Sequence, residues 1–574
     1  MTKSLTKDKI FSGDRMKLLF KNANVVNVFT GTCEKADVLI ENDKIIGVGE
    51  YSEADVIKDV SGKYICPGFI DSHIHIESSM LSPSEFAKVC VPHGTTSVIA
   101  DPHEIANVCG KKGIEYMLEA SENIPLDVYL MLPSCVPATM YCESGATLEA
   151  EDLEEFYSHP RVLGLGEVMN YVGVVFGDEK LLKKIKAAKS HGLTVNGHAP
   201  LLMGAELDKY ISAGIEDDHE CTSPDEAKER ISKGQKIMIR QGTSAKNLEA
   251  MIPLFDEPWC RHCMLVTDDK HPADLLNNGH IDDIIRSAVK YGKSAIIGIQ
   301  MATIQAAEHY GLKNIGAVSP GYNADILVLD DLDTVSVSEV YKNGVCVTEN
   351  SFDIPKISPE LENAVKNSFN LKELSEEDFL IDCNTKKKCN VIGVIKGELL
   401  TDKKIMTIDF SKNNGTDIES DILKIAVIER HNNTGHTGLG FINGIGLKEG
   451  AIASSVSHDS HNLIIIGTNE SDMAYAGNRI REIGGGNVVV RNGEIIAEMP
   501  LSIAGLMTEM SAKEIADLNK KVRDCVYTLG ADKDIEPFMT MAFVGLPVIP
   551  HLKLTTKGLV DVNKYELISL FAED

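Results

Sequence analysis

Eight short apolar segments, separated from one another by polar stretches long enough for a helix, constrain the fold of this chain more than any other feature. The segments are 69–76, 97–101, 127–132, 163–167, 194–198, 215–219, 236–240 and 264–268. Most have the length and the Val, Ile and Leu content of a buried strand, whereas 194–198 and 215–219 are mixed in composition. Eight strands alternating with helices predict a (β/α)₈ TIM barrel, and a doubly wound parallel sheet is the alternative.

Most of these segments end in a side chain that can bind a metal ion. The terminal residues are His75, Asp101, Glu167, His198, His219 and Asp268. A barrel gathers the carboxyl ends of its strands at one face, where its chemistry takes place. Each histidine taken singly is more often a hydrogen-bonded structural residue. Their convergence with carboxylates, and the placement of His73 on the same strand face as His75, predict a metal site.

The barrel is flanked by segments with strand-and-turn patterns. Alternating apolar residues around Asn42-Asp43 predict a hairpin, and a second hairpin signal lies at Asn343-Gly344. One small β-sandwich domain built from both flanks accounts for these patterns, because the ends of an inserted domain lie close together. The chain is thus predicted to be an α/β protein of three domains. Residues 1–65 and 316–359 form the β-domain, residues 66–315 the catalytic barrel, and residues 360–574 a C-terminal α+β domain.

The composition limits the partners. A net charge of -28 over 574 residues argues against sequence-independent binding to nucleic acid or anionic membranes, which requires clustered Lys and Arg. A small neutral or cationic substrate suits this charge better. Thirteen scattered cysteines are typical of reduced thiols, and the chain has neither a signal-peptide pattern nor an apolar run of membrane-spanning length, so a cytoplasmic location is expected.

Several motifs carry a family resemblance. The segment 67–75 (PGFIDSHIH), the histidines that end the fifth and sixth strands, the aspartate that ends the eighth, and the segment 316–325 resemble the amidohydrolase superfamily. The segments 93–104, 164–169, 217–221 and 455–462 resemble its bacterial adenine deaminase branch. The resemblance covers nearly the whole chain.

This resemblance implies a hydrolase of purine salvage that converts adenine into hypoxanthine and ammonia, with a metal-activated hydroxide attacking C6. It implies Mn²⁺ or Fe²⁺ as the metal, with Zn²⁺ as the alternative, and a binuclear site is expected. The expected ligands are His73, His75 and Asp268 for one ion, His198 and His219 for the other, and Glu167 between them. Many relatives that act on cyclic amides carry a carboxylated lysine where this chain has Glu167, which disfavours that branch.

Further roles are expected for residues beside the ligands. Asp268 is the expected proton carrier, and Glu104 is expected to protonate N1, unless it only caps the next helix. His103 and Asp101 are expected to orient Glu104 or the attacking water. The loops around Ser134, Met169 and Asn170 are expected to line the base pocket. His458 either closes the barrel mouth as part of a lid or is a structural residue of its own domain.

Two other functions remain open at this point. One is a different amidohydrolase that acts on another nucleobase or a cyclic amide. The other is a non-catalytic barrel that serves in assembly, which the complete ligand set disfavours. The expected partners are a small-molecule substrate and a second copy of the chain in a homodimer, without nucleic acid or membrane.

Overall fold

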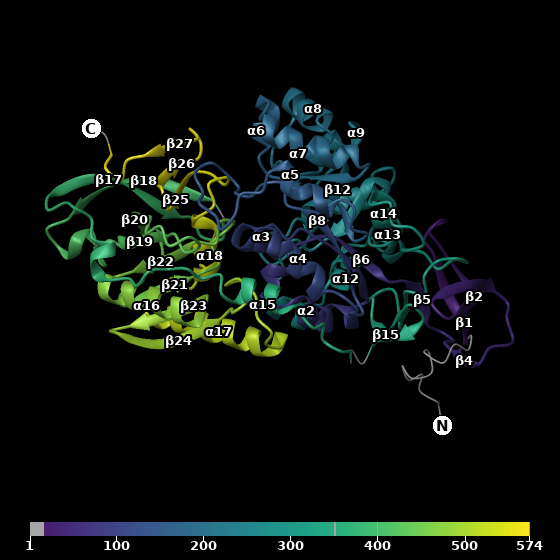
Figure 1. Cartoon of the computed structure of the whole chain (residues 1–574). Coiled ribbons are helices and arrows are strands. Elements are labelled where there is room, and N and C mark those ends of the chain that lie inside the picture. Colours follow the sequence, from purple (N-terminus) through teal and green to yellow (C-terminus); the bar gives the residue numbers. More distant parts are fainter. Residues whose placement is uncertain (1–15, 349–351, 399, 573–574) are drawn as a thin grey trace.

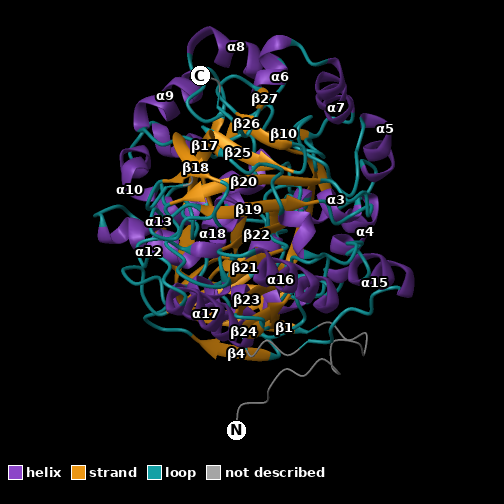
Figure 2. Ribbon diagram, turned by 90° about the vertical axis from the view of Figure 1, so that its left-hand side faces the viewer, coloured by secondary structure: helices purple, strands orange, loops and turns teal. Residues whose placement is uncertain are grey.

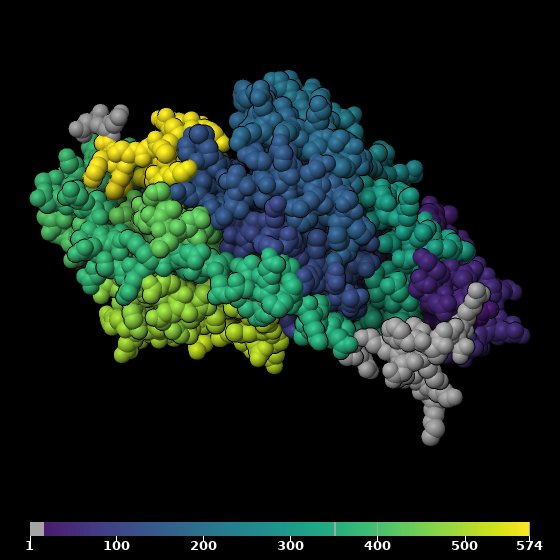
Figure 3. All heavy atoms as spheres, viewed as in Figure 1, coloured from purple at the N-terminus to yellow at the C-terminus, as the bar shows by residue number. Residues whose placement is uncertain are grey.

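The structure is a computed structural model that describes residues 16–348, 352–398 and 400–572. It consists of three parts (Figure 1). A barrel with surrounding helices lies in the middle of the molecule. The β-domain and the C-terminal domain lie on opposite sides of it, as the surface view also shows (Figure 3). The barrel is therefore the part that both other domains contact.

The barrel has eight parallel strands. They are β6 (Phe69–Ile74), β7 (Thr95–Ala100), β8 (Asp127–Leu132), β9 (Val162–Val168), β10 (Thr194–Gly197), β11 (Asp217–Asp218), β12 (Lys236–Arg240) and β13 (Cys263–Val266). Strands β6 to β10 form one run and β11 to β13 another. The backbone N–H of Glu216 donates to Val195 (3.0 Å) and joins the runs, and a parallel bridge between Ile74 and Asp268 closes the ring. The predicted alternation and the barrel are confirmed.

Apolar side chains fill the inside of this ring. Residues from different strands meet there in one buried cluster that includes Ile70, Ile99, Met131, Met238 and Met264. Outside the ring, helices such as α7 (Glu179–Ser190) and α12 (Ile281–Lys290) bury one face against the strands. In α12 the buried residues Ile281, Ile284, Ile285 and Ala288 follow the three-and-four spacing of a helix face. The barrel is thus a packed core whose strand ends remain available for chemistry.

The β-domain is formed from both flanks of the barrel. From the N-terminal flank come β1 (Lys17–Asn27), β2 (Thr32–Glu41), β3 (Lys44–Gly49), β4 (Val56–Asp59) and β5 (Tyr64–Pro67), and from the other flank β14 (Ile326–Leu329), β15 (Val337–Lys342) and β16 (Val345–Cys346). β14 pairs antiparallel with β5 in one continuous sheet. The sheet curls over its own core, since the ring of Tyr341 packs edge-on against Phe20 at 5.0 Å.

The C-terminal domain is built on a second eight-stranded sheet. Its spatial order is β18 (Thr401–Asp409), β17 (Lys386–Val394), β20 (Thr437–Asn443), β19 (Leu423–Ile428), β22 (Leu463–Gly467), β21 (Ala451–Ser454), β23 (Gly486–Arg491) and β24 (Glu494–Pro500). Figure 2 looks onto this sheet. Helix α16 (Glu470–Ile483) packs Met473, Ala476 and Ile480 against it, and α17 (Ala512–Thr528) adjoins β23 and β24. A small sheet of β25 (Leu552–Thr555), β26 (Gly558–Asp561) and β27 (Glu566–Ile568) completes the domain.

Backbone hydrogen bonds join this domain to the barrel. The N–H of Ser82 donates to the carbonyl of Thr508, and the N–H of Thr508 donates to the carbonyl of Met80, both at 2.9 Å. Met80 follows strand β6, which carries His73. The C-terminal domain is thereby tied to the segment next to the predicted metal site.

Within the described ranges, no helix has the length and apolar character needed to cross a membrane.

Candidate metal centre and active site

The predicted metal ligands converge at the carboxyl ends of the barrel strands. His73 and His75 come from the end of β6, and their Nε2 atoms lie 3.6 and 3.1 Å from Oδ1 of Asp268. All three side chains are buried. Their ligand-capable atoms lie within 4.8 Å of one another, close enough to share an ion.

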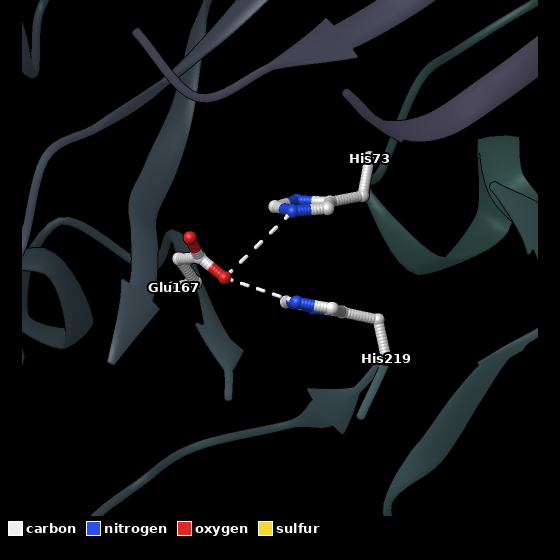
Figure 4. Close-up of side chains that lie close together, drawn as sticks. All are labelled: His73, Glu167 and His219. Carbon is white, nitrogen blue, oxygen red and sulfur yellow. Dashed lines mark ion pairs between the residues drawn. The ribbon is translucent and has the colours of Figure 1, made fainter. Parts of the chain in front are cut away.

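Glu167, at the end of β9, lies between the two groups of histidines. One oxygen, Oε2, is 2.8 Å from Nδ1 of His198 and 3.0 Å from Nε2 of His219, while Nε2 of His73 is 3.9 Å away. The other oxygen, Oε1, is 3.5 Å from Nε2 of His75. Figure 4 shows the carboxylate facing both His73 and His219, whose rings are stacked at 4.3 Å. Glu167 is thus close to both groups of predicted ligands.

The electrostatics keep the two carboxylates of this centre ionised. Burial alone would raise the pKa of Glu167, but the neighbouring charges and hydrogen bonds of His198 and His219 hold it well below its ordinary value. The pKa of Asp268 is likewise held well below its usual range against burial, chiefly by the guanidinium of Arg240. Both carboxylates are therefore ionised at neutral pH, as metal ligands must be.

Asp268 occupies a constrained position just beyond β13. Its backbone is in the left-handed region with φ of 59°, which is uncommon for a residue other than glycine. Its N–H donates to the carbonyl of His73 (3.0 Å), and its own carbonyl accepts from the N–H of His75 (3.1 Å). Arg240 Nη1 donates to Oδ2 at 2.7 Å, so the carboxylate presents Oδ1 to the histidines. The backbone of Asp268 is thus fixed by the end of β6, and its side chain is fixed by Arg240 of β12.

The donor set fits divalent metal ions. His73 is fully buried, yet among the described residues neither of its ring nitrogens has a hydrogen-bond partner, and Nδ1 of His219 and Oδ1 of Asp101 also lack one. Unpaired buried polar atoms are costly unless something outside the chain satisfies them. Imidazole and carboxylate ligands together suit Mn, Fe or Zn ions. The barrel mouth therefore has groups of side chains that can hold a metal ion.

Asp101 and His103 lie directly beside this centre. Oδ2 of Asp101 accepts the backbone N–H of Glu167 (2.9 Å), and its carbonyl oxygen lies 3.0 Å from Nδ1 of His75. Nδ1 of His103 is 3.6 Å from Oε1 of Glu167. Asp101 thus orients two of the ligands. His103 forms a further ligand-capable group with His75 and Glu167.

Glu104 follows His103 at the start of α3 (His103–Cys109) and meets two histidines of the C-terminal domain. Its Oε1 lies 2.6 Å from Nδ1 of His458, and its Oε2 pairs closely with Nε2 of His461. Burial would raise the pKa of Glu104, but the charges of both histidines hold it well below its ordinary value. Beside Glu104, the pKa of His458 is raised to about 9 against the effect of burial. Glu104, His458 and His461, here called the interdomain cluster, join the domains at the barrel mouth.

The residues predicted to line the base pocket are Ser134, Met169 and Asn170. Their side chains make contacts within the protein near the metal centre. The hydroxyl of Ser134 donates to the backbone carbonyl of Glu167, and Lys184 donates to the carbonyl of Ser134 at 2.8 Å. The side chain of Asn170 accepts from Gly173 N (2.8 Å) and begins helix α6 (Tyr171–Phe176). Met169 is buried in the main hydrophobic core. Ser134 and Asn170 therefore support the strand end that carries Glu167.

The sequence analysis missed three residues of the site. Glu220 lies 3.7 Å from Nδ1 of His198 and is held by Arg240, which also holds Asp268. Arg240 ends a predicted strand, and this position alone places it at the active face of the barrel. It was not selected, because arginine does not bind metal ions. His461 stands in the segment 455–462, but only the fold brings it to Glu104, which is 357 positions away along the chain.

Comparison with known proteins agrees with this geometry. Residues 64–347 match the amidohydrolase family, and residues 398–566 match the adenine deaminase C-terminal domain. "Adenine deaminase 2" of Carboxydothermus hydrogenoformans is 46% identical over 554 residues, which is 96% of each chain. "Adenine deaminase" of Clostridium acetobutylicum is 46% identical over 556 residues, 96% of this chain and 97% of the relative. "Adenine deaminase" of Bacillus velezensis is 44% identical over 556 residues, 96% of each.

The two matches cover the barrel and the C-terminal domain. The barrel matches a family of metal-dependent hydrolases, and it brings together side chains that can bind a metal ion. The chain belongs to the adenine deaminase family of amidohydrolases.

Proposed function

We propose that this protein hydrolyses adenine to hypoxanthine and ammonia at the barrel mouth. The observation that carries the proposal is the convergence of His73, His75, Glu167, His219 and Asp268 in one buried cluster. Relatives that align along nearly the whole chain are adenine deaminases. The protein is thus a hydrolase that acts on a C–N bond other than a peptide bond.

The proposed metal ligands are His73 and His75 with Asp268 for one ion, His198 and His219 for the other, and Glu167 between them. The ions, when bound, supply an activated water for attack at C6. Asp268 is ionised and fixed by Arg240, so it can accept a proton and pass it to the departing ammonia. Glu220 beside His198 and His219 adds a further negative charge.

Attack at C6 also requires a proton on N1, and we assign its delivery to the interdomain cluster. Glu104 alone would be a poor acid, because its pKa is held well below the ordinary value. His458 is protonated at neutral pH, since its pKa is raised to about 9, and it lies 2.6 Å from Glu104. We propose that Glu104 passes to N1 a proton that it shares with His458.

A cavity between the barrel and the C-terminal domain adjoins Glu104. Its lining combines polar groups with aromatic faces and includes Glu77, Glu104, His271, His458 and Phe543. The ring of His458 stacks on Phe543 at 4.5 Å. Flat apolar and polar surfaces of this kind suit an uncharged aromatic base. We propose that adenine reaches the metal centre from this side.

The metal ions, the oligomeric state, the cellular location and the partners are also part of this proposal. The mixed nitrogen and oxygen ligation supports Mn²⁺ or Fe²⁺ as the ions, with Zn²⁺ as an alternative. The family resemblance supports a homodimer that acts in the cytoplasm in purine salvage. The acidic composition supports a partner set without nucleic acid.

The test is ammonia release from a panel of purines, pyrimidines and cyclic amides by the Mn²⁺-loaded protein, with a chelated sample as control. We expect turnover of adenine that disappears on chelation and returns with added metal. Turnover of a cyclic amide or of another nucleobase without turnover of adenine would contradict the proposal. It would favour the alternative of a different amidohydrolase, while no turnover of any compound at full metal loading would favour a non-catalytic role.

A further inference from the structure

One buried carboxylate at the barrel mouth has no role in the scheme above. Asp459 lies between His458 and His461, and only 3% of its surface is exposed. Its Oδ2 atom is buried and has no hydrogen-bond partner within the described residues. The nearest cation-forming group is Nε2 of His103, 4.0 Å from Oδ1, which is too long for a hydrogen bond.

The chain around Asp459 is held from several sides. The N–H of His458 donates to the carbonyl of Ala542 (2.9 Å), and the N–H of His461 donates to that of Ser457 (2.7 Å). Arg430 Nε donates to the carbonyl of His461 at 2.6 Å. The position of the carboxylate is therefore fixed by its neighbours. A fixed and buried acceptor without a donor is costly unless a ligand supplies that donor.

The ring of His103 lies between Asp459 and the metal centre. One nitrogen of its ring, Nδ1, faces Glu167 at 3.6 Å, and the other, Nε2, faces Asp459. Asp459 thus lies about one imidazole ring beyond the bridging carboxylate. A base whose C6 lies at the metal centre would extend its far half away from Glu167.

The chemistry of adenine leaves one donor for such a carboxylate. An ionised carboxylate only accepts hydrogen bonds. Adenine has two kinds of N–H, the 6-amino group and one N–H of its imidazole ring. The amino group leaves from C6 and must lie at the metal centre, so the imidazole N–H remains.

We propose that Asp459 is a substrate-binding residue that accepts a hydrogen bond from the imidazole N–H of the purine. The inference rests on the proposed function and deepens it. It assigns part of the selectivity for a free base to the C-terminal domain. A base substituted on its imidazole ring, as in a nucleoside, cannot make this hydrogen bond.

The first test compares Asp459→Ala and Asp459→Asn in the metal-loaded enzyme, with Asp534→Ala as a control at an exposed carboxylate of the same domain. We expect Asp459→Ala to raise KM for adenine roughly 10- to 100-fold, the range for a hydrogen bond to a charged group, with a smaller change in kcat. Asp459→Asn keeps an acceptor oxygen and should recover part of the loss. Metal content and thermal unfolding should match the wild type, and unchanged KM in both folded variants would overturn the inference.

The second test asks which hydrogen the carboxylate recognises, without relying on turnover. Calorimetry gives the dissociation constants of hypoxanthine, 7-methylhypoxanthine and 9-methylhypoxanthine for the wild type, Asp459→Ala and Asp459→Asn, and the asparagine variant still serves if the alanine variant does not fold. The wild type should prefer hypoxanthine, Asp459→Ala should lose most of this preference, and Asp459→Asn, which keeps an acceptor oxygen, should show a weaker preference than the wild type. A preference that persists unchanged would overturn the inference. Failure of the wild type to deaminate adenine would instead contradict the proposed function.

Discussion

Two clusters of buried histidines and carboxylates lie at the same barrel mouth, and they differ in how their polar atoms are satisfied. In the metal centre, both ring nitrogens of His73 lack a hydrogen-bond partner among the described residues. In the interdomain cluster, each oxygen of Glu104 faces its own histidine, Nδ1 of His458 at 2.6 Å and Nε2 of His461. The same residue types therefore form two clusters that differ in their hydrogen bonding.

Unpaired ring nitrogens distinguish a metal site from other clusters of buried histidines. A buried histidine such as His73, with no hydrogen-bond partner for either ring nitrogen among the described residues, indicates a ligand from outside the chain. One carboxylate oxygen per histidine instead gives two closed hydrogen-bonded pairs, which position a proton and tie two domains together. The following predictions test this distinction, beginning with the largest expected effect.

The number of bound ions should depend on the first cluster alone. His73→Ala should reduce the bound metal and bring ammonia release down to the chelated background, because a primary ligand is lost. His461→Ala should keep the wild-type metal content, since its partner is Glu104. Elemental analysis after dialysis measures both variants. Loss of one ion from His461→Ala would show that the interdomain cluster also holds metal.

Asp268 should carry a proton as well as bind metal. We expect Asp268→Asn to lower kcat by roughly 10²- to 10⁴-fold, because the amide cannot accept the proton. The adjacent Asp269→Asn is the matched control and should keep kcat within about tenfold, since the carboxylate of Asp269 accepts a hydrogen bond from the hydroxyl of Ser78. Steady-state rates at measured metal content decide this, and near-normal turnover of Asp268→Asn would refute the assignment.

The interdomain cluster should make stability depend on pH. The pKa of His458 is raised to about 9, so its contribution is fully present below the unfolded value of about 6.5 and is lost as pH rises through 9. This contribution amounts to at most roughly 3 kcal/mol. The depressed pKa of Glu104 acts oppositely, and its contribution is lost only as pH falls below the ordinary carboxyl range.

Glu104→Gln should therefore flatten the fall in the free energy of unfolding between pH 7 and 9.5, and it should slow turnover. Urea unfolding at several pH values and fixed metal loading measures the first effect. If the slope of the variant equals that of the wild type, His458 does not owe its raised pKa to Glu104.

The smallest effect is expected at Ser134. Its hydroxyl donates to the backbone carbonyl of Glu167, so Ser134→Ala removes one hydrogen bond behind the bridging ligand. We expect a loss of about 1 kcal/mol in stability and less than about tenfold in kcat/KM. A larger rise in KM alone would show that the hydroxyl contacts the base directly.

Much of the barrel could be predicted from the sequence because its signals are local. Each strand is a short apolar run, and the residue that ends it lies at the active face. His198 and Asp268 could be named for this reason alone. Short runs rich in Val, Ile and Leu likewise form β19 and β23 of the C-terminal domain.

The rest of the site depends on contacts that local patterns do not encode. Arg240 reaches Glu220 and Asp268 from neighbouring strands, which only the closed ring brings together. The pairing of His461 with Glu104 requires the C-terminal domain to dock on the barrel mouth. The two readings of His458, as part of a lid or as a structural residue, could not be separated before its contact with Glu104 was known.

The short backbone pairing between Met80, Ser82 and Thr508 has a consequence for substrate traffic. Swinging the C-terminal domain away as a hinge would break both amide hydrogen bonds and expose the cluster around Glu104 to solvent. Opening the domain in each turnover would therefore carry the cost of these hydrogen bonds and of the contacts of Glu104 with His458 and His461. We expect adenine to enter, and ammonia to leave, by rotation of side chains that line the cavity, such as those of His458 and Phe543.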